Sequence, residues 1–298
     1  MKIGCHVSNS GDEMLLGSVK EALSYKANCF MVYLGPPQST MRKDVSRLNI
    51  NLMKEELIKN NISLDDVIIH APYIVNLASP IDEKREFGID FITREMKAMA
   101  LVGAKYMVLH PGAHMNEGIE KGLDTIADSV IKVLENTKGD NTYIALETMA
   151  GKGTECCFDF SHIAYLINRI NSDRIVVCFD TCHTNDSGYD LINDYEGVMK
   201  EFDELIGLDK IKVFHINDSL NIKGAKKDRH ANFGFGNIGF DTLMKFVKDE
   251  RFISVPKILE TPYVKSGNDS YPPYKYEIEM IRKGEFDPDL LEKIVKGV

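Results

Sequence analysis

The sequence predicts a single (β/α)8 barrel, a TIM barrel of class α/β, that spans residues 1–298. Short apolar runs rich in strand-forming residues recur along the whole chain, and amphipathic stretches with helical spacing separate them. Alternation of strand and helix indicates a parallel sheet, and eight repeats are the number that closes such a sheet into a barrel. A chain of 298 residues with 44% hydrophobic residues can bury one core of that size.

Eight apolar runs are expected to form the strands. In chain order they are Ile3–His6, Phe30–Tyr33, Val67–His70, Tyr106–His110, Tyr143–Glu147, Ile175–Asp180, Ile211–His215 and Lys257–Glu260. Apolar residues three and four positions apart predict helices between them. The clearest of these stretches are Phe91–Leu101, Gly122–Thr137, Ser161–Ile170, Tyr195–Ile206 and Phe240–Lys248. The Pro- and Tyr-rich segment Ser266–Tyr274 is expected to be a loop before the terminal helices.

Charge and cysteine usage limit the classes of function. The formal charge of −9 argues against a protein that coats nucleic acid with a uniformly basic surface, so any contact with nucleic acid must be local. The six cysteines form no Cys-x-x-Cys pair, and the chain opens without a signal-like segment, which indicates a reduced cytoplasmic protein. No apolar run approaches the roughly 18 residues of a membrane span, so no membrane contact is expected.

Six consecutive predicted strands end on a histidine or an acidic residue. These residues are His70, His110, Glu147, Asp180, His215 and Glu260. In a barrel of parallel strands all the carboxyl ends lie at one face, where sites are built. Two short motifs in adjoining loops, Asp180-Thr-Cys-His183 and Asp228-Arg-His230, add His183, Asp228 and His230 to the set.

Nine such groups are too many for one ion, because zinc takes about four ligands. Four carboxylates that converge without cations would repel one another, so the pattern predicts a cluster of two or three divalent ions. The mixture of imidazole and carboxylate favours Zn2+, with Mn2+ or Fe as alternatives at one or more sites. Cys178 and Cys182 are attributed to core packing.

Each of these residue types has a simpler explanation when it occurs alone. A histidine at a strand end is usually a hydrogen-bonded core or rim residue, and a carboxylate at a loop start usually caps a helix. The joint pattern across six strand ends outweighs these explanations for the nine ligands. His6 and His114 are interpreted as supporting or rim groups, and His162 receives no role.

The string Gly234–Gly239 matches the dinucleotide fingerprint G-x-G-x-x-G. That fingerprint must follow a strand and open a helix, whereas this string follows the polar run Lys226–Asn232. A flexible loop near a site is therefore the favoured interpretation.

The motifs together resemble the endonuclease IV family, the zinc-dependent apurinic/apyrimidinic endonucleases of family 2. The matching strings run in order along nearly the whole chain: His6–Ser8, Phe30–Gln38, His70–Leu77, Val108–Gly112, Ala145–Thr148, Val177–His183, Phe214–Ser219, Lys227–His230 with Gly234 and Gly236, and Ile258–Pro262. Their combination is far more specific than any one of them. Leu220 departs from the family, which usually has a lysine there, and this puts one phosphate contact in doubt.

The resemblance implies three zinc ions and divides the ligands among them. The first ion would bind His70, His110 and Glu147. The second would bind Glu147, Asp180, His215 and Glu260, and the third would bind His183, Asp228 and His230. Glu147 would then bridge two ions and be the central catalytic residue.

The resemblance also implies an activity. The family hydrolyses the phosphodiester bond 5′ to an abasic site, leaving a 3′-hydroxyl and a 5′-deoxyribose phosphate, as a step of base excision repair. It also removes 3′ blocking groups as a 3′-phosphodiesterase and 3′-phosphatase. The expected partner is double-stranded DNA with abasic sites or blocked 3′ ends, and the expected state is a monomer.

Selectivity requires side chains that fill the gap beside an extruded abasic nucleotide. By resemblance Tyr73, Ile74 and Gln38 are expected to contact DNA, together with Arg229. Tyr73 has an alternative interpretation as ordinary rim packing. Basic side chains in the mouth loops are interpreted either as phosphate contacts or as solvated charges: Arg42, Lys43, Lys223, Lys226, Lys227 and Arg229.

Two other functions remain open from the residues. Sugar isomerases and epimerases place one or two divalent ions at the same face of related barrels, so the number of bound ions discriminates. A metal-stabilised protein that recognises DNA lesions without cutting them would bind damaged duplex tightly and leave it intact.

Overall fold

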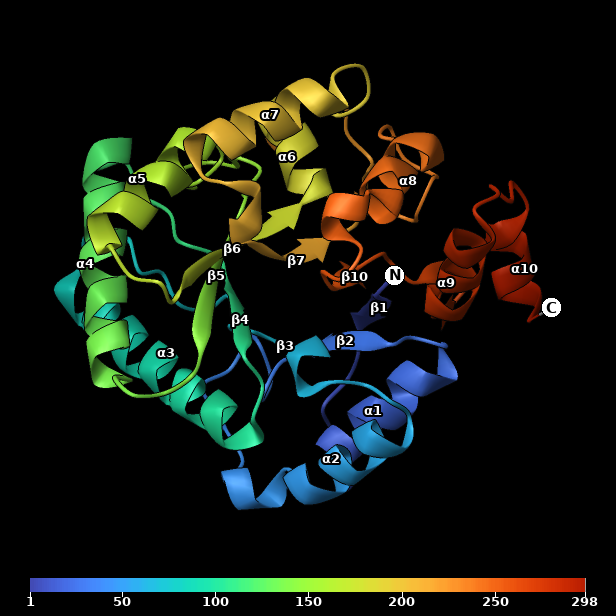
Figure 1. Ribbon diagram of the computed structural model, residues 1–298, viewed down its shortest axis with the longest axis horizontal. Coiled ribbons are helices and arrows are strands. Elements are labelled where there is room, and N and C mark those ends of the chain that lie inside the picture. Colours follow the sequence, from blue (N-terminus) through green and yellow to red (C-terminus); the bar gives the residue numbers. More distant parts are fainter. Residues whose placement is uncertain (298) are drawn as a thin grey trace.

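The computed structural model describes residues 1–297 and confirms the predicted barrel. Eight parallel strands close into a ring whose neighbours follow the order of the chain, from β1 through β7 to β10 and back to β1 (Figure 1). The strands are β1 (Ile3–His6), β2 (Cys29–Val32), β3 (Val67–His70), β4 (Tyr106–Leu109), β5 (Tyr143–Glu147), β6 (Ile175–Asp180), β7 (Ile211–His215) and β10 (Lys257–Leu259). Each lies within one residue of its predicted bounds at both ends.

Helices surround the ring (Figure 1). They are α1 (Leu15–Ser24), α2 (Ile50–Lys59), α3 (Asp82–Val102), α4 (Ile119–Asn136), α5 (Phe160–Ile170), α6 (Thr181–Ser187), α7 (Tyr195–Leu205), α8 (Phe240–Lys248), α9 (Tyr274–Lys283) and α10 (Leu290–Lys296). Short 3-10 turns are η1 (Val45–Arg47), η2 (Leu64–Asp66), η3 (Leu208–Lys210) and η4 (Glu250–Phe252). The terminal helix α9 packs beside β1 and completes the outer layer.

Four short strands lie outside the barrel as two antiparallel pairs. β8 (Asp218–Ser219) pairs with β9 (His230–Ala231), and β11 (Val264–Ser266) pairs with β12 (Asp269–Tyr271). The prediction of a loop over Ser266–Tyr274 was therefore wrong for the strand residues, whereas residues 267–268 and 272–273 lie outside regular elements before α9, as expected. Gly267 has a φ of +60° and, with the following asparagine, turns this hairpin, because glycine accepts the left-handed conformation that a tight hairpin turn needs.

One predicted helix begins earlier than its apolar pattern indicates. α3 starts at Asp82 rather than Phe91, with Asp82 and Glu83 in its first turn, where acidic groups interact favourably with the helix dipole. The first two turns are mostly exposed, so hydrophobic spacing alone does not reveal them.

Two apolar layers hold the barrel together. One set of buried side chains comes only from strands and fills the interior, with Met31, Ile68 and Val108 among its members. The strand residues that alternate with them face outward, and their side chains pack against the apolar faces of the helices in a second, larger core. All six cysteines are buried as free thiols. Within residues 1–297, no helix combines the length and the apolarity that a membrane crossing needs.

We predict that Phe246→Ala lowers the free energy of unfolding by about 3–5 kcal/mol, because it removes a fully buried ring. Phe246 on α8 contacts the rings of Tyr195, Phe179 and Phe214, with centroids 4.7, 5.6 and 6.1 Å away. Denaturant unfolding measures the loss. The control Phe87→Ala truncates a ring that is 41% exposed, and a cost of about 1 kcal/mol is expected. Equal losses in both variants would contradict the proposed core.

Candidate metal centre

All nine predicted ligands lie at the carboxyl ends of the strands. Their donor atoms form three sets, each with its atoms within 4.8 Å of one another. The sets are His70, His110 and Glu147; Glu147, Asp180, His215 and Glu260; and His183, Asp228 and His230. Two further groups within the same distance include Cys178 or Cys182 in place of one of these ligands.

The scaffold positions the first two sets through the strands. His70, Glu147, Asp180 and His215 are the last residues of β3, β5, β6 and β7, and all four are buried. The barrel register places Asp180 opposite His215 on neighbouring strands. His110 and Glu260 were predicted as strand ends, but each lies one residue beyond its strand. The third set comes from α6 and from the β8–β9 hairpin.

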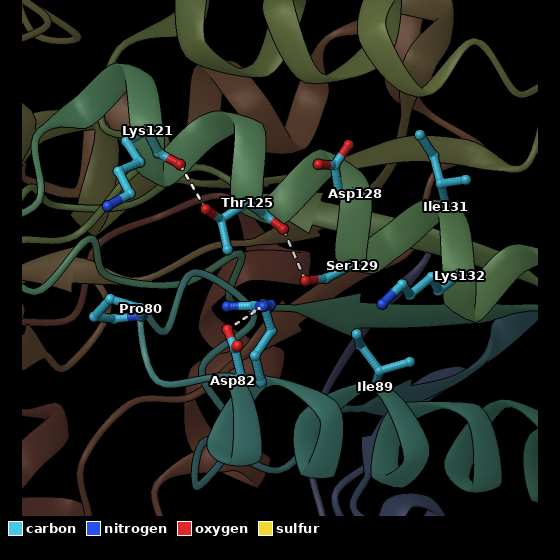
Figure 2. A pocket seen from close by; sticks show the side chains of 10 residues that line it. Pro80, Asp82, Ile89, Lys121, Thr125, Asp128, Ser129, Ile131 and Lys132 are labelled. Atoms are coloured by element: carbon cyan, nitrogen blue, oxygen red, sulfur yellow. Dashed lines mark hydrogen bonds and ion pairs between the residues drawn. The ribbon is translucent and has the colours of Figure 1, made fainter.

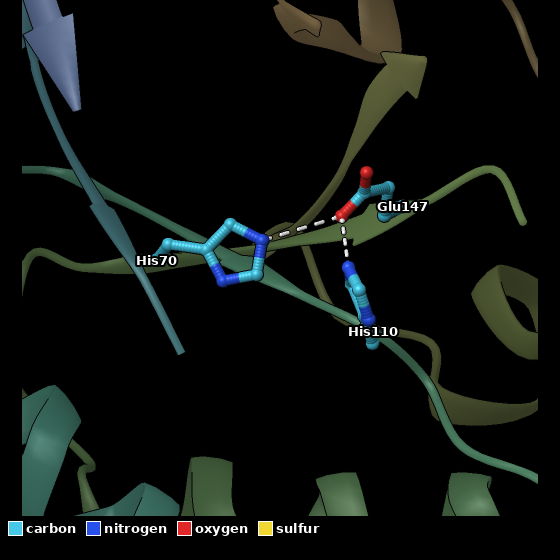
Figure 3. A group of neighbouring side chains, drawn as sticks. All are labelled: His70, His110 and Glu147. Atoms are coloured by element: carbon cyan, nitrogen blue, oxygen red, sulfur yellow. Dashed lines mark ion pairs between the residues drawn. The ribbon is translucent and has the colours of Figure 1, made fainter. Parts of the chain in front are cut away.

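Glu147 is the central group of the site. Its Oε2 lies 3.0 Å from His110 Nε2 and 3.5 Å from His70 Nε2, as Figure 3 shows. Its Oε1 lies 3.0 Å from His215 Nδ1 and 3.3 Å from His183 Nδ1. The two oxygens of one buried carboxylate thus face different histidines, which is the arrangement a bridging ligand needs.

Backbone carbonyls fix the orientation of three imidazole rings. His70 Nδ1 lies 2.6 Å from the Ala71 oxygen, His183 Nδ1 3.0 Å from the Thr148 oxygen, and His230 Nδ1 3.2 Å from the Glu260 oxygen. When Nδ1 donates to a carbonyl, Nε2 carries the lone pair that a metal needs. The rings are therefore held with Nε2 toward the cavity.

Several buried polar atoms of the site have no hydrogen-bond partner among the described residues. They include Glu147 Oε2 and His230 Nε2. His110 Nε2 lies 3.0 Å from Glu147 Oε2, and His230 Nε2 lies 3.5 Å from Asp228 Oδ1, yet neither pair forms a hydrogen bond. Buried polar atoms are normally satisfied. Atoms that approach one another without bonding fit a set of ligands directed at common cations.

The electrostatics of the site point the same way. Burial raises the pKa of Asp180, although His183 and His230 oppose this. Burial also disfavours the charged form of Glu147, but His215 and His110 hold the pKa of Glu147 well below its usual range. Burial disfavours a charged His183 too, yet Asp180 raises the pKa of His183 well above its usual range. Positive charge from the histidines thus stabilises the Glu147 carboxylate, whereas burial prevails at Asp180. Divalent ions would supply further positive charge to both groups.

Two residues that support the ligands were missed by the sequence analysis. Asn217 Nδ2 donates to Asp180 Oδ2 at 2.9 Å and to Glu260 Oε2 at 3.3 Å, and its Oδ1 accepts the Glu260 amide at 2.8 Å. Thr148 Oγ1 accepts the Asp180 amide at 2.9 Å. Thr148 and Asn217 both lie within the strings that resemble the family, next to or near candidate ligands in the sequence. This proximity was the only feature of the sequence that could have indicated their role.

The four residues predicted to contact DNA lie in loops at the mouth. Gln38 follows β2, Tyr73 and Ile74 follow β3, and Arg229 lies on the hairpin between β8 and β9. Tyr73 is 47% exposed, whereas Ile74 is half-buried. The Tyr73 ring meets the edge of Tyr33, whose ring in turn packs against His70. This contact connects the exposed ring to a candidate ligand.

The basic side chains of the mouth loops differ in their surroundings. Both interpretations of Arg42 were wrong, because its guanidinium pairs with the buried Glu95 at 2.8 Å and donates to carbonyls of residues 36, 39 and 41. Arg42 thus braces the loop that carries Gln38. Lys223 pairs with Asp190. In the described chain, the exposed side chains of Lys227 and Arg229 form no ion pair or hydrogen bond.

The glycine string at residues 234–239 binds a carboxylate of the protein itself. The amides of Gly236, Ile238 and Gly239 donate to Asp218, whose side chain is buried. A Cβ at Gly236 would lie 2.4 Å from the Ser219 oxygen, so only glycine fits there. The string therefore anchors the base of the β8–β9 hairpin. It is a loop near the candidate site, as predicted, but its bonds to Asp218 hold it in place, which the predicted flexibility did not anticipate.

A polar groove of about 630 Å³ lies between α3 and α4 on the outside of the barrel, and none of the candidate ligands lines it (Figure 2). Its cations already have partners, since Arg85 pairs with Asp82 and Lys132 pairs with Glu86. The convergent donor atoms at the barrel mouth are the stronger candidate for a functional site.

Comparison with known proteins places this chain in a family. Residues 19–284 match the family model described as "Xylose isomerase-like TIM barrel". A probable endonuclease 4 of Bacillus velezensis is 50% identical over 297 residues, which cover 99% of each chain. Endonuclease IV from Thermus thermophilus is 26% identical with a TM-score of 0.82, covering 95% of this chain and 98% of that one.

A more distant solved structure shares the fold alone. A D-tagatose 3-epimerase-like protein is 18% identical with a TM-score of 0.68, covering 100% of this chain and 99% of that one. The full-length identity to the endonuclease 4 proteins is much higher. The chain therefore belongs to the endonuclease IV family.

Proposed function

We propose that this protein is a DNA repair hydrolase that cleaves the phosphodiester bond 5′ to an abasic site in double-stranded DNA. The observation that carries the proposal is the convergence of nine imidazole and carboxylate ligands in three sets at the barrel mouth. A water oxygen would form the new bond to phosphorus, and the bond from phosphorus to the 3′ oxygen would break. The attacking water would lose a proton and the departing 3′ oxygen would take one up, so the products would be a 3′-hydroxyl and a 5′-deoxyribose phosphate.

The same chemistry extends to blocked 3′ ends. Removal of a 3′ phosphate or phosphoglycolate also cleaves a bond between phosphorus and the 3′ oxygen, so one set of groups serves both reactions. We therefore include 3′-phosphodiesterase and 3′-phosphatase activity in the proposal, as part of base excision repair.

Three divalent ions fit the three ligand sets. We propose Zn2+, with Mn2+ or Fe as alternatives, because imidazole nitrogen and carboxylate oxygen are mixed in every set. Bound ions of this kind lower the pKa of water to provide a nucleophile and neutralise charge on the reacting phosphate. Glu147 would bridge the first two sets through its two oxygens. Asn217 would hold Asp180 and Glu260 in orientation.

Selectivity for the abasic nucleotide is assigned to the mouth loops. A nucleotide that has lost its base lacks stacking, so its extrusion into a pocket costs less than that of a normal nucleotide. Tyr73, with Ile74 and Gln38 beside it, would enter the gap left in the duplex, as apolar and aromatic wedges do. Lys227 and Arg229 are free to contact phosphates, which makes local binding compatible with the net charge of −9.

The central experiment uses a duplex with one tetrahydrofuran abasic analogue and protein of measured metal content. We expect nicking 5′ to the analogue, loss of nicking after chelation, and recovery when Zn2+ is restored. Extension of the nicked strand by a polymerase would report the 3′-hydroxyl. If protein with all its ions bound the duplex tightly but did not nick it, a lesion-binding protein would be favoured. If the protein held only one or two ions and had sugar epimerase activity, the isomerase alternative would be favoured.

The bridging role of Glu147 is tested by Glu147→Gln. Glutamine keeps the shape of the side chain but removes the negative charge that two ions would share, so nicking should fall more than about a hundredfold. The far-ultraviolet circular dichroism spectrum should stay unchanged, because strand and helix packing do not depend on the charge. The matched control Glu250→Gln alters an exposed residue in η4, before β10 and away from the mouth, and should nick normally. Normal turnover by Glu147→Gln would refute the bridging role.

The wedge role of Tyr73 is tested by Tyr73→Ala. We expect the ratio of affinities for abasic and intact duplex to fall roughly tenfold, because a ring stacked in the gap is worth about 1–3 kcal/mol. The rate of nicking at saturating abasic duplex should change less, since Tyr73 is not a ligand. Tyr73→Phe keeps the ring and should retain the discrimination. An unchanged affinity ratio for Tyr73→Ala would reject the wedge and leave Tyr73 as rim packing.

A further inference from the structure

Asp186 is a buried carboxylate that joins two segments of the candidate metal centre. It lies on α6, one turn after His183, and its side chain is fully buried. Its Oδ1 accepts hydrogen bonds from Ser219 Oγ at 2.6 Å and from Asn185 Nδ2 at 3.1 Å. Its Oδ2 accepts from Asn221 Nδ2 at 2.7 Å and from the Asp228 amide at 3.3 Å. One side chain on α6 therefore binds both arms of the β8–β9 hairpin.

The hairpin arm that Asp186 holds has a demanding backbone. Asp228 has a φ of +86°, in the left-handed region that residues other than glycine rarely adopt. Such a conformation persists only where the surroundings enforce it. The bond from the Asp228 amide to Asp186 contributes to this, and the Lys226 amide donates to the Asp186 carbonyl at 2.8 Å.

The charge of Asp186 is balanced in an uncommon way. No lysine, arginine or histidine of residues 1–297 forms an ion pair with it, so its partners are hydroxyl, side-chain amide and backbone amide groups. A buried carboxylate without a cation is costly unless every lone pair is used. Four directed hydrogen bonds meet that requirement, and they also fix where the hairpin lies relative to α6.

The third ligand set spans this junction. His183 comes from α6, whereas Asp228 and His230 come from the far arm of the hairpin. His183 Nε2 lies 3.2 Å from Asp228 Oδ1. Asp186 touches no donor atom of the set, but it binds the amide of one ligand and lies on the helix of another.

We propose that Asp186 is a positioning residue for the third ion, which sets the separation between His183 and Asp228. The inference rests on the proposed function, because that function assigns an ion to this set. It explains why α6 carries a fully buried carboxylate whose side-chain oxygens contact no candidate metal-donor atom of this set.

The test compares the metal content of wild-type protein and Asp186→Asn. Asparagine replaces one acceptor by an amide donor, which faces groups that themselves donate. We expect the affinity for one of three Zn2+ ions to fall about 10- to 100-fold, measured by competition with a chromophoric chelator. After dialysis against limiting zinc, the variant should retain two ions per chain. Excess Zn2+ should restore nicking.

A spectroscopic readout separates positioning from a general loss of structure. In cobalt-substituted protein, Asp186→Asn should lose the visible absorption of one ion and keep that of the other two. The milder variant Asn221→Ala deletes one donor at the rim of the junction and should weaken the same ion several-fold, so the inference stays testable if Asp186→Asn does not fold. Asp190→Asn changes a half-buried carboxylate that pairs with Lys223 on the same hairpin, and it should bind three ions as the wild type does.

The outcomes distinguish this inference from the proposed function. If wild-type protein binds three ions and neither Asp186→Asn nor Asn221→Ala changes the weakest affinity, the inference is wrong and the proposed function stands. If wild-type protein binds fewer than three ions, the metal assignment and this inference fail together.

Discussion

The buried carboxylate of Glu147 is the interaction on which the centre depends. It ends β5 in the middle of the arc of strands that carry ligands, and its two oxygens face histidines from β3, β7, α6 and the residue after β4. An isolated carboxylate at this depth would be strongly disfavoured. It is tolerated because positive charge converges on it, and convergence is a property of parallel strands whose carboxyl ends meet at one face.

The three ligand sets differ in how firmly the fold holds them. The first two sets are built mainly on strand ends, where the ladder and the layered interior restrict the backbone. The third set lies on a short helix and on a hairpin whose strands pair over only two residues each, so few backbone hydrogen bonds hold it. Two buried aspartates compensate, since Asp218 binds the glycine loop under the hairpin and Asp186 binds its arms. Precision at this set comes from side chains rather than from the sheet.

The sequence predicts the barrel and the convergence of the nine candidate ligands well for a physical reason. Strands buried on both faces read as continuous apolar runs, so a histidine or an acid at the end of such a run is conspicuous. The same logic fails for groups that act between distant segments. Asn217, Asp186 and the Arg42–Glu95 pair owe their roles to contacts across 33 to 53 positions, which no local pattern encodes. Exposed elements such as the start of α3 and the β11–β12 hairpin lack the apolar signal altogether.

The barrel alone does not decide the chemistry, because epimerase-like proteins of low identity share it. The distinction lies in what is added at the mouth. An acidic chain would repel DNA as a whole, yet four of its carboxylates belong to the candidate ligand sets, where bound cations would offset their charge. Lys227 and Arg229, on either side of Asp228 in the chain, have no partner within the described residues. In the proposed function, a phosphate drawn to these two cations would arrive beside the third candidate set, so the hairpin that carries these residues would also guide the substrate to them.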